Sequence, residues 1–229
     1  MSINTQISRW VIQAAGAPSD LQRISSELGK GDPSGVVHNQ SLYLESSELD
    51  KASSLVAAEW AAFDFMKLLS AAFEVHFDES IPLNLVSVRE SDSDRADHTV
   101  GRHAAEPSLL QRTVQLALAR PQAQTAILAY ASGGPDGLFR AYEAMTYEIL
   151  NLRLTTSSAG VGTREWLIEQ GWITEAEDDR FLSTVLHFRD CLERQCPGDA
   201  LSLKEAAILV RRLLVNLLRH CLELPLSSH

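Results

Sequence analysis

The sequence is short of cysteine and of basic charge, and both shortages limit what the protein can be. Its three cysteines are Cys191, Cys196 and Cys221. No histidine or cysteine cluster accompanies them at zinc spacing, so we expect no metal site and reduced thiols, with a Cys191–Cys221 or Cys196–Cys221 disulfide as the alternative. Lys and Arg number 20 against 30 Asp and Glu, a formal net charge of -10. Proteins that bind nucleic acid through its phosphates carry a basic surface, so a nucleic-acid contact here would need a local patch.

Long apolar runs and the common catalytic signatures are also missing. No run reaches the roughly 18 apolar residues that can span a bilayer. Residues 1–6 lack the basic and apolar regions of a secretory signal. We therefore expect a cytoplasmic, microbial protein without membrane contact. GxSxG, HExxH, paired CxxC, the phosphate-binding loop and kinase motifs do not occur, and we expect no cofactor.

The first 106 residues alternate between strand and helix patterns. Their apolar spacing predicts strands at 10–14, 34–38, 41–45, 83–90 and 97–103, and helices at 18–28 and about 50–73. The Asn39-Gln40 pair joins the second and third strands as a hairpin. Two helices can cover one face of a small sheet. Residues 1–106 are therefore predicted to form an α+β domain with a small antiparallel or mixed sheet layer.

The rest of the chain reads as helical. Residues 107–137 form a predicted helical connector, with helices at 109–119 and 122–130, and the Gly- and Pro-rich segment at its end favours a domain boundary. Within residues 138–229, two capping boxes mark helix starts, one at Thr174 with Glu177 and one at Ser202 with Glu205. With helical patterns at 138–152 and 164–170, this region is predicted to be an all-α bundle of about four helices.

One arginine continues an apolar helix stripe in this bundle. Five apolar residues follow the spacing of a single helix face: Phe181, Leu182, Val185, Leu186 and Leu192. Arg189 falls on the same face, and an arginine side chain stays charged and is costly to bury unpaired. Arg189 is therefore expected to be paired, to sit at a seam between helices, or to face a partner.

Four segments of residues 138–224 resemble a known family: Leu138 to Glu143, Leu167 to Ile173, His187 to Asp190, and Leu201 to Ala206. Together they are similar to the HEPN superfamily, small helical bundles of prokaryotic toxin–antitoxin and defence systems. In active members, an Arg and a polar residue followed by a His form a metal-independent RNA-cleaving site in a dimer. Arg189 and Asp190 match the first part of that signature. Gln195 and Cys196 stand where the histidine is expected, so the resemblance implies a helical homodimer more securely than an enzyme.

A rearranged site is the catalytic alternative. His220, or else His187, could serve as the general acid or base beside Arg189 and Asp190, because histidine exchanges protons near neutral pH. The simpler interpretation of His220 is a solvated histidine favoured by the helix C-terminus. Three arginines of the last helix, Arg211, Arg212 and Arg219, give it a basic side. They form either a phosphate-contacting strip or a solvated helix face.

Three functions are consistent with these patterns. The first is a non-catalytic HEPN-like module for dimerisation, regulation or binding, of a prokaryotic defence or toxin–antitoxin type. The second is a metal-independent RNase with a rearranged Arg/His site. The third is a structural subunit of a larger complex. The missing histidine and the acidic charge favour the first, with a homodimer as the expected assembly and a further protein or RNA as candidate partners.

Overall fold

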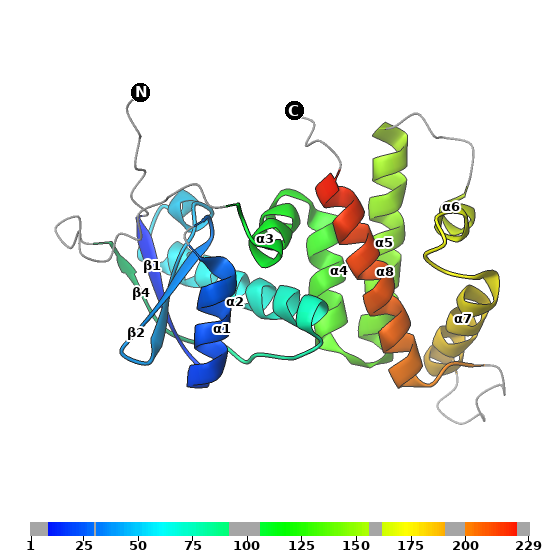
Figure 1. The fold of residues 1–229 in the computed structure, drawn as a ribbon, viewed down its shortest axis with the longest axis horizontal. Coiled ribbons are helices and arrows are strands. Elements are labelled where there is room, and N and C mark those ends of the chain that lie inside the picture. The colour runs from blue at the N-terminus through cyan, green and yellow to red at the C-terminus, as the bar shows by residue number, and fades with distance from the viewer. Residues whose placement is uncertain (1–8, 30, 92–105, 156–161, 191–199, 224–229) are drawn as a thin grey trace. The chain divides into compact units, whose positions relative to one another are not determined.

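Residues 9–29, 31–91, 106–155, 162–190 and 200–223 are described by the structure, a computed structural model (Figure 1). The chain divides into two units, Met1–Leu118 and Ala119–His229, called here the sheet unit and the helical unit. The first is α+β and the second is helical, as the sequence predicts. The connector expected at 107–137 is shared between them, because its first helix belongs to the sheet unit and its second to the helical unit.

The sheet unit contains four strands and four helical segments among the described residues. They are β1 (Trp10–Ala15), α1 (Pro18–Leu28), β2 (Ser34–His38), β3 (Ser41–Glu45), the 3-10 helix η1 (Leu49–Lys51), α2 (Leu55–Phe77), β4 (Asn84–Glu90) and α3 (Leu109–Ala119). The strand order is β2-β3-β1-β4, and every neighbouring pair is antiparallel. This βαββαβ order is the ferredoxin-like arrangement. The further strand predicted at 97–103 lies outside the described residues.

Local signals explain most boundaries of the sheet unit. Asn39 and Gln40 both have positive φ, 48° and 62°, which is the two-residue turn that suits a twisted hairpin. The start predicted for the long helix was wrong: η1 occupies residues 49–51, and α2 begins after Ser54, whose hydroxyl accepts a hydrogen bond from the Ala57 amide at 3.3 Å. The helix also continues to Phe77, where Asp78 ends it in the left-handed conformation.

The core of the sheet unit lies between the sheet and its helices. α1 packs on β2 and β3, and α2 packs on β4. Ile12 in β1 pairs with Leu44 on one side and Val88 on the other, and all three are buried. α3 is joined to the loop after α1 by the Gln111 amide, which donates to the carbonyl oxygens of Leu28 and Pro33, the latter at 2.9 Å.

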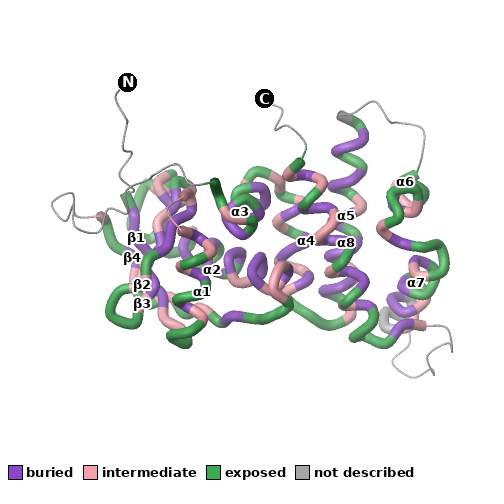
Figure 2. The backbone as a smooth tube through the Cα atoms, in the orientation of Figure 1, coloured by how far each residue is buried: buried purple, intermediate pink, exposed green. Residues whose placement is uncertain are grey.

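The helical unit contains α4 (Pro121–Ser132), α5 (Gly134–Thr155), α6 (Thr163–Glu169), α7 (Glu175–Asp190) and α8 (Leu203–Glu223). α5 contacts each of the other four, and buried residues line α4, α5 and α8 where they pack together (Figure 2). The turn between α4 and α5 is tight, because Gly133 and Gly134 both take positive φ, 66° and 68°.

Both predicted capping boxes are present. The Thr174 hydroxyl accepts from the Glu177 amide at 3.2 Å, and the Glu177 carboxylate accepts from the Thr174 amide at 2.9 Å. Ser202 and Glu205 make the same exchange at 3.3 and 2.8 Å. Each box supplies partners for amides that a helix start leaves unpaired.

Candidate functional site

The residues singled out in the bundle belong to α7 and α8, which run antiparallel. The Arg212 guanidinium in α8 contacts the Glu177 carboxylate in α7 at 2.8 Å. Further along α7, the buried Thr184 hydroxyl accepts from the Leu201 amide, just before α8, at 2.7 Å. Moving forward along α7 therefore means moving backward along α8, so the C-terminal ends of the two helices point in opposite directions.

This arrangement separates the two halves of the rearranged site within one chain. His220 lies eight residues beyond Arg212, about 12 Å along α8 at 1.5 Å per residue. Arg189 lies twelve residues beyond Glu177, about 18 Å in the opposite direction. The backbones of Arg189 and His220 are thus about 30 Å apart along the helix pair. The side chains of Arg189 and Asp190 lie outside the described residues, and the half-buried His187 is two residues from Arg189 on the same helix.

His220 packs instead in an aromatic cluster with Trp166 of α6 and Trp172 of the turn that follows. Its ring centroid lies 5.6 Å from that of Trp166 and 5.7 Å from that of Trp172, and the two indoles are 5.0 Å apart. The rings meet at 65° to 78°, the edge-to-face geometry that aromatic quadrupoles favour. Rings in direct contact leave no space between them for a ligand, so the cluster joins α6 to α8.

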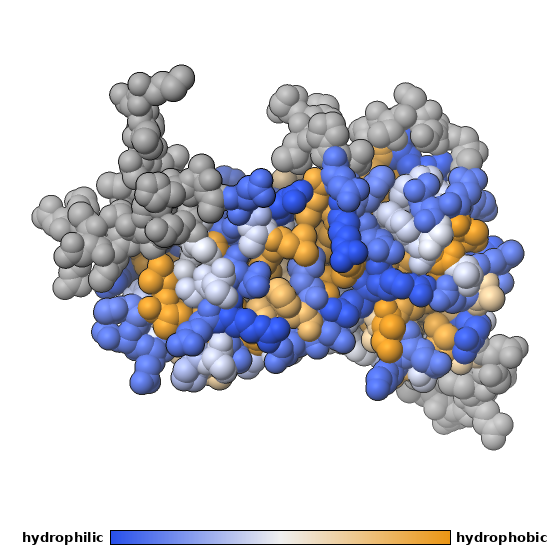
Figure 3. Space-filling view, in the orientation of Figure 1, coloured by the Kyte–Doolittle hydropathy of each residue, from blue (hydrophilic) through white to orange (hydrophobic). Residues whose placement is uncertain are grey.

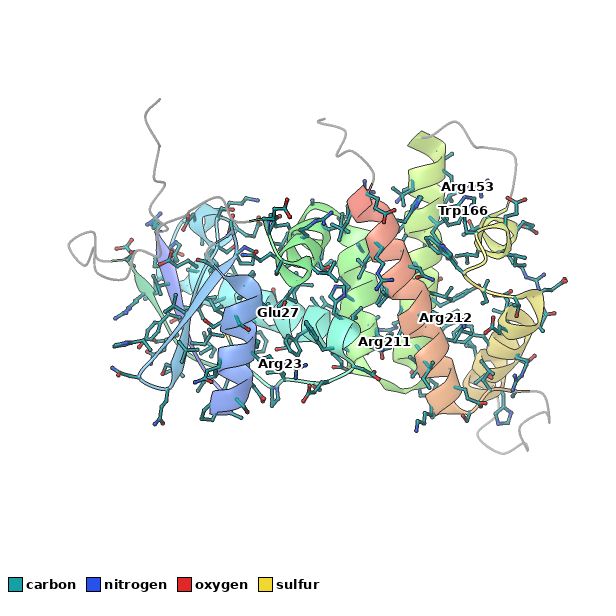
Figure 4. All side chains as sticks on the ribbon, viewed as in Figure 1. Arg23, Glu27, Arg153, Trp166, Arg211 and Arg212 are labelled. Carbon is teal, nitrogen blue, oxygen red and sulfur yellow. The ribbon has the colours of Figure 1, made fainter. Side chains whose placement is uncertain are left out.

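Only part of the predicted basic strip, Arg211, Arg212 and Arg219, is available to contact a phosphate. Arg211 and Arg212 lie on α8 (Figure 4), where Arg211 is half-buried and Arg212 and Arg219 are exposed. Arg212 is paired with Glu177. Partial burial of Glu177 opposes ionisation, but hydrogen bonds from Thr174 and Arg212 outweigh it and lower the pKa of this carboxyl. Arg212 is therefore occupied in joining α7 to α8.

A buried carboxylate network in the helical unit was not anticipated. Asp178 in α7 accepts from the Tyr142 hydroxyl of α5 at 2.5 Å and from Nε of Arg164 in α6 at 2.6 Å. Arg164 also contacts Asp179 at 2.5 Å. Burial raises the pKa of Tyr142, and its hydrogen bond to Asp178 raises it further. Tyr142 is therefore a neutral donor at physiological pH, and the network ties three helices together.

Another ion pair with a buried carboxylate lies where α4, α5 and α8 meet. Arg120 contacts the buried carboxylate of Glu148 at 2.6 Å. Cys221 is free and buried, so neither disulfide alternative forms. Burial, followed by the charge of Glu148, raises the pKa of the Cys221 thiol to about 12. The thiol stays protonated at neutral pH and is a poor nucleophile.

The described part of the chain contains no group of three or more His, Cys, Asp or Glu side chains arranged to hold a metal ion. Nor is any helix in it both long and apolar enough to cross a membrane. No family model matches the chain, and no curated protein or solved structure shows a significant match. The resemblance to HEPN proteins stays a prediction.

Proposed function

We propose that this chain is a non-catalytic, HEPN-like module that works by binding other proteins, a second copy of itself included. One observation carries the proposal: His220 packs against two tryptophans, about 30 Å along the helix pair from Arg189. A general acid or base must lie within hydrogen-bond reach of the reacting group, directly or through one water. Within one chain these two residues are too far apart to share a substrate atom.

The buried ionisable groups described in the helical unit support the same proposal. Tyr142 and Asp178 hold each other in a buried pair, and Glu148 is held by Arg120. The Cys221 thiol is buried and protonated. These groups stabilise helix contacts, and none of them combines exposure with an activated protonation state, as catalysis requires. The proposed setting is the prokaryotic cytoplasm, in the defence or toxin–antitoxin context that the resemblance implies.

The test is an RNA-cleavage assay on purified full-length protein. The size-exclusion fraction, with its mass measured by light scattering, is incubated with labelled single-stranded RNA in EDTA. We expect the RNA to stay intact. Metal-independent cleavage that is lost in both Arg189→Ala and His220→Ala would overturn the proposal and favour an RNase assembled between chains. Cleavage that survives both substitutions would refute the Arg189 and His220 site, and its persistence at constant specific activity through a further purification step would contradict the proposal.

RNA binding without cleavage is measured on the same samples. The matched variants are Arg219→Ala, which removes an exposed cation, and Arg212→Ala, which removes one already paired with Glu177. If the chain is a protein-binding module, we expect no measurable affinity for RNA at physiological salt and no difference in RNA binding between the two variants. A tight complex that weakens with salt and with Arg219→Ala would make the last helix a phosphate-contacting surface and contradict the proposal.

A further inference from the structure

The first half of α2 carries an exposed apolar stripe. Val56 is 62% exposed, Trp60 is 69% exposed and Phe63 is 44% exposed. On the face drawn in Figure 3, apolar residues reach the surface in patches among hydrophilic ones. Tryptophan is usually mostly buried, and adjacent exposed apolar side chains mark interaction sites more often than scattered ones do. We call Val56, Trp60, Phe63 and the exposed Lys67 the α2 stripe.

The α2 stripe has the spacing of a helix-pairing surface. Its members Val56, Trp60, Phe63 and Lys67 are separated by four, three and four residues. That 4-3-4 spacing is the seam of a coiled coil. The opposite side of the same turns, at Ala58, Ala62 and Phe65, is buried in the core of the sheet unit. α2 is thus held in place by one face and presents a regular seam on the other.

We propose that the α2 stripe is a two-fold interface with a second copy of this chain. The area fits such a partner. Together with Leu55, which is 46% exposed, the stripe leaves about 400 Å² of apolar side-chain surface in water, given that an aromatic side chain offers roughly 150–250 Å². A stable interface takes about 800 Å² from each partner, of which roughly 60% is apolar. The stripe supplies most of that apolar share.

One pair of charges at the stripe, Lys67 and Glu59, is self-complementary in an antiparallel pairing. With a two-fold axis between Trp60 and Phe63, Trp60 faces the partner's Phe63. Lys67 then lies one helical turn from the partner's Glu59, and the symmetry repeats this pair at the other end. The Lys67 ammonium lies 4.1 Å from the Phe63 ring centroid, so its aliphatic part runs back along the stripe toward Phe63. This interface is in the sheet unit and does not depend on whether the helical unit is catalytic.

The main experiment compares a stripe variant with a matched variant on another exposed helix face. Full-length protein, Trp60→Glu and Leu154→Glu are each measured by sedimentation over a dilution series. Leu154 belongs to a second exposed apolar set on α5, with Tyr147 and Leu150, and is 66% exposed. We expect a dimer whose dissociation constant rises at least about thirtyfold in Trp60→Glu, because buried tryptophans dominate interface energies. Leu154→Glu should leave it unchanged.

Two outcomes would overturn the proposal. One is a monomer across the dilution series, and the other is a dimer whose dissociation constant is unchanged in Trp60→Glu, whether or not Leu154→Glu weakens it. Circular dichroism of each variant separates a lost interface from lost folding. Exposed positions on a helix tolerate glutamate, so both variants should retain the parent's helical signal.

Charge reversal tests the antiparallel register. Glu59→Lys and Lys67→Glu should each weaken the dimer, and the double variant should recover most of the loss, because it restores the pair between chains. Residues 59 and 67 are two helical turns apart in one chain, about 12 Å, so they do not contact each other there. If the double variant instead shows the sum of the two single losses of dimer affinity, this register is wrong.

Discussion

The two units bury different kinds of polar group. Among the described residues, the buried polar side chains of the sheet unit are Ser34, Ser46, Gln111 and Thr113, all uncharged. Those of the helical unit are Glu148, Arg153, Asp178 and Thr184, three of them charged. Neighbouring strands are joined by backbone hydrogen bonds. Helices use their backbone hydrogen bonds internally, so separate helices are joined through their side chains. Inside the protein, the helical unit therefore depends on ion pairs and the sheet unit on neutral hydrogen bonds.

The largest expected effect of breaking this comparison is at Asp178. Asp178→Ala leaves the Tyr142 hydroxyl and the Arg164 guanidinium without their buried acceptor. Arg164 is 39% exposed and keeps Asp179, so the main loss is the buried hydrogen bond from Tyr142 to a carboxylate, which contributes about 1.5–3 kcal/mol. We expect amide protection to fall throughout α5, α6 and α7, and to stay at the parent level in β1 and β3. Hydrogen exchange read by mass spectrometry measures both units in one sample.

Asp179→Ala is the matched control for that prediction. Asp179 accepts from the same arginine, but its side chain is 63% exposed, and exposed ion pairs contribute about 0–1 kcal/mol. The exchange pattern of Asp179→Ala should therefore match the parent. Equal losses in the two variants would show that the burial of Asp178 is not what stabilises the helical unit.

The next effect is in the sheet unit, at Gln111. Its amide donates to the carbonyls of Leu28 and Pro33, which join α3 to the end of α1. In Gln111→Ala these buried acceptors lose their donor, at a cost of about 1–3 kcal/mol. We expect faster exchange in α1 and α3 and no change in α7 and α8. An equal loss of amide protection in both units would contradict the expectation that each unit is stabilised by its own polar contacts.

Features set by neighbouring residues were predictable from the sequence. The Pro18 start and Gly29 end define α1 at 18–28, the Asn39-Gln40 pair defines the hairpin, and Thr174 and Ser202 cap their helices as expected. The start of α2 was misplaced because the polar residues before it offer several alternative caps. Only tertiary context selects Ser54.

The candidate site could not be predicted in the same way. Tyr142 and Asp178 are 36 residues apart in sequence, and Arg212 and Glu177 are 35 apart. Each of these residues looks like an ordinary member of its own helix, so no local pattern indicates the pair. His220 shows the same limit: its position on α8 was clear, but its tryptophan neighbours follow from how α6 returns to α8.

The smallest effect is the response of each unit to acid, and the two units should respond with opposite sign. Glu177 in the helical unit has a lowered pKa, so it contributes stability that is present above its unfolded value and lost as pH falls through the folded one. Glu74 in α2 has a raised pKa, chiefly from burial, so its ionisation opposes folding and acidification relieves that penalty. Between about pH 6 and pH 3 these two carboxyls should therefore shift stability from the helical to the sheet unit. Hydrogen exchange is measured across that pH range in both variants. Glu177→Gln should reduce the pH dependence of stability in the helical unit, and Glu74→Gln should reduce it in the sheet unit. Dependences on pH of the same sign at both positions would contradict the contrast between the units.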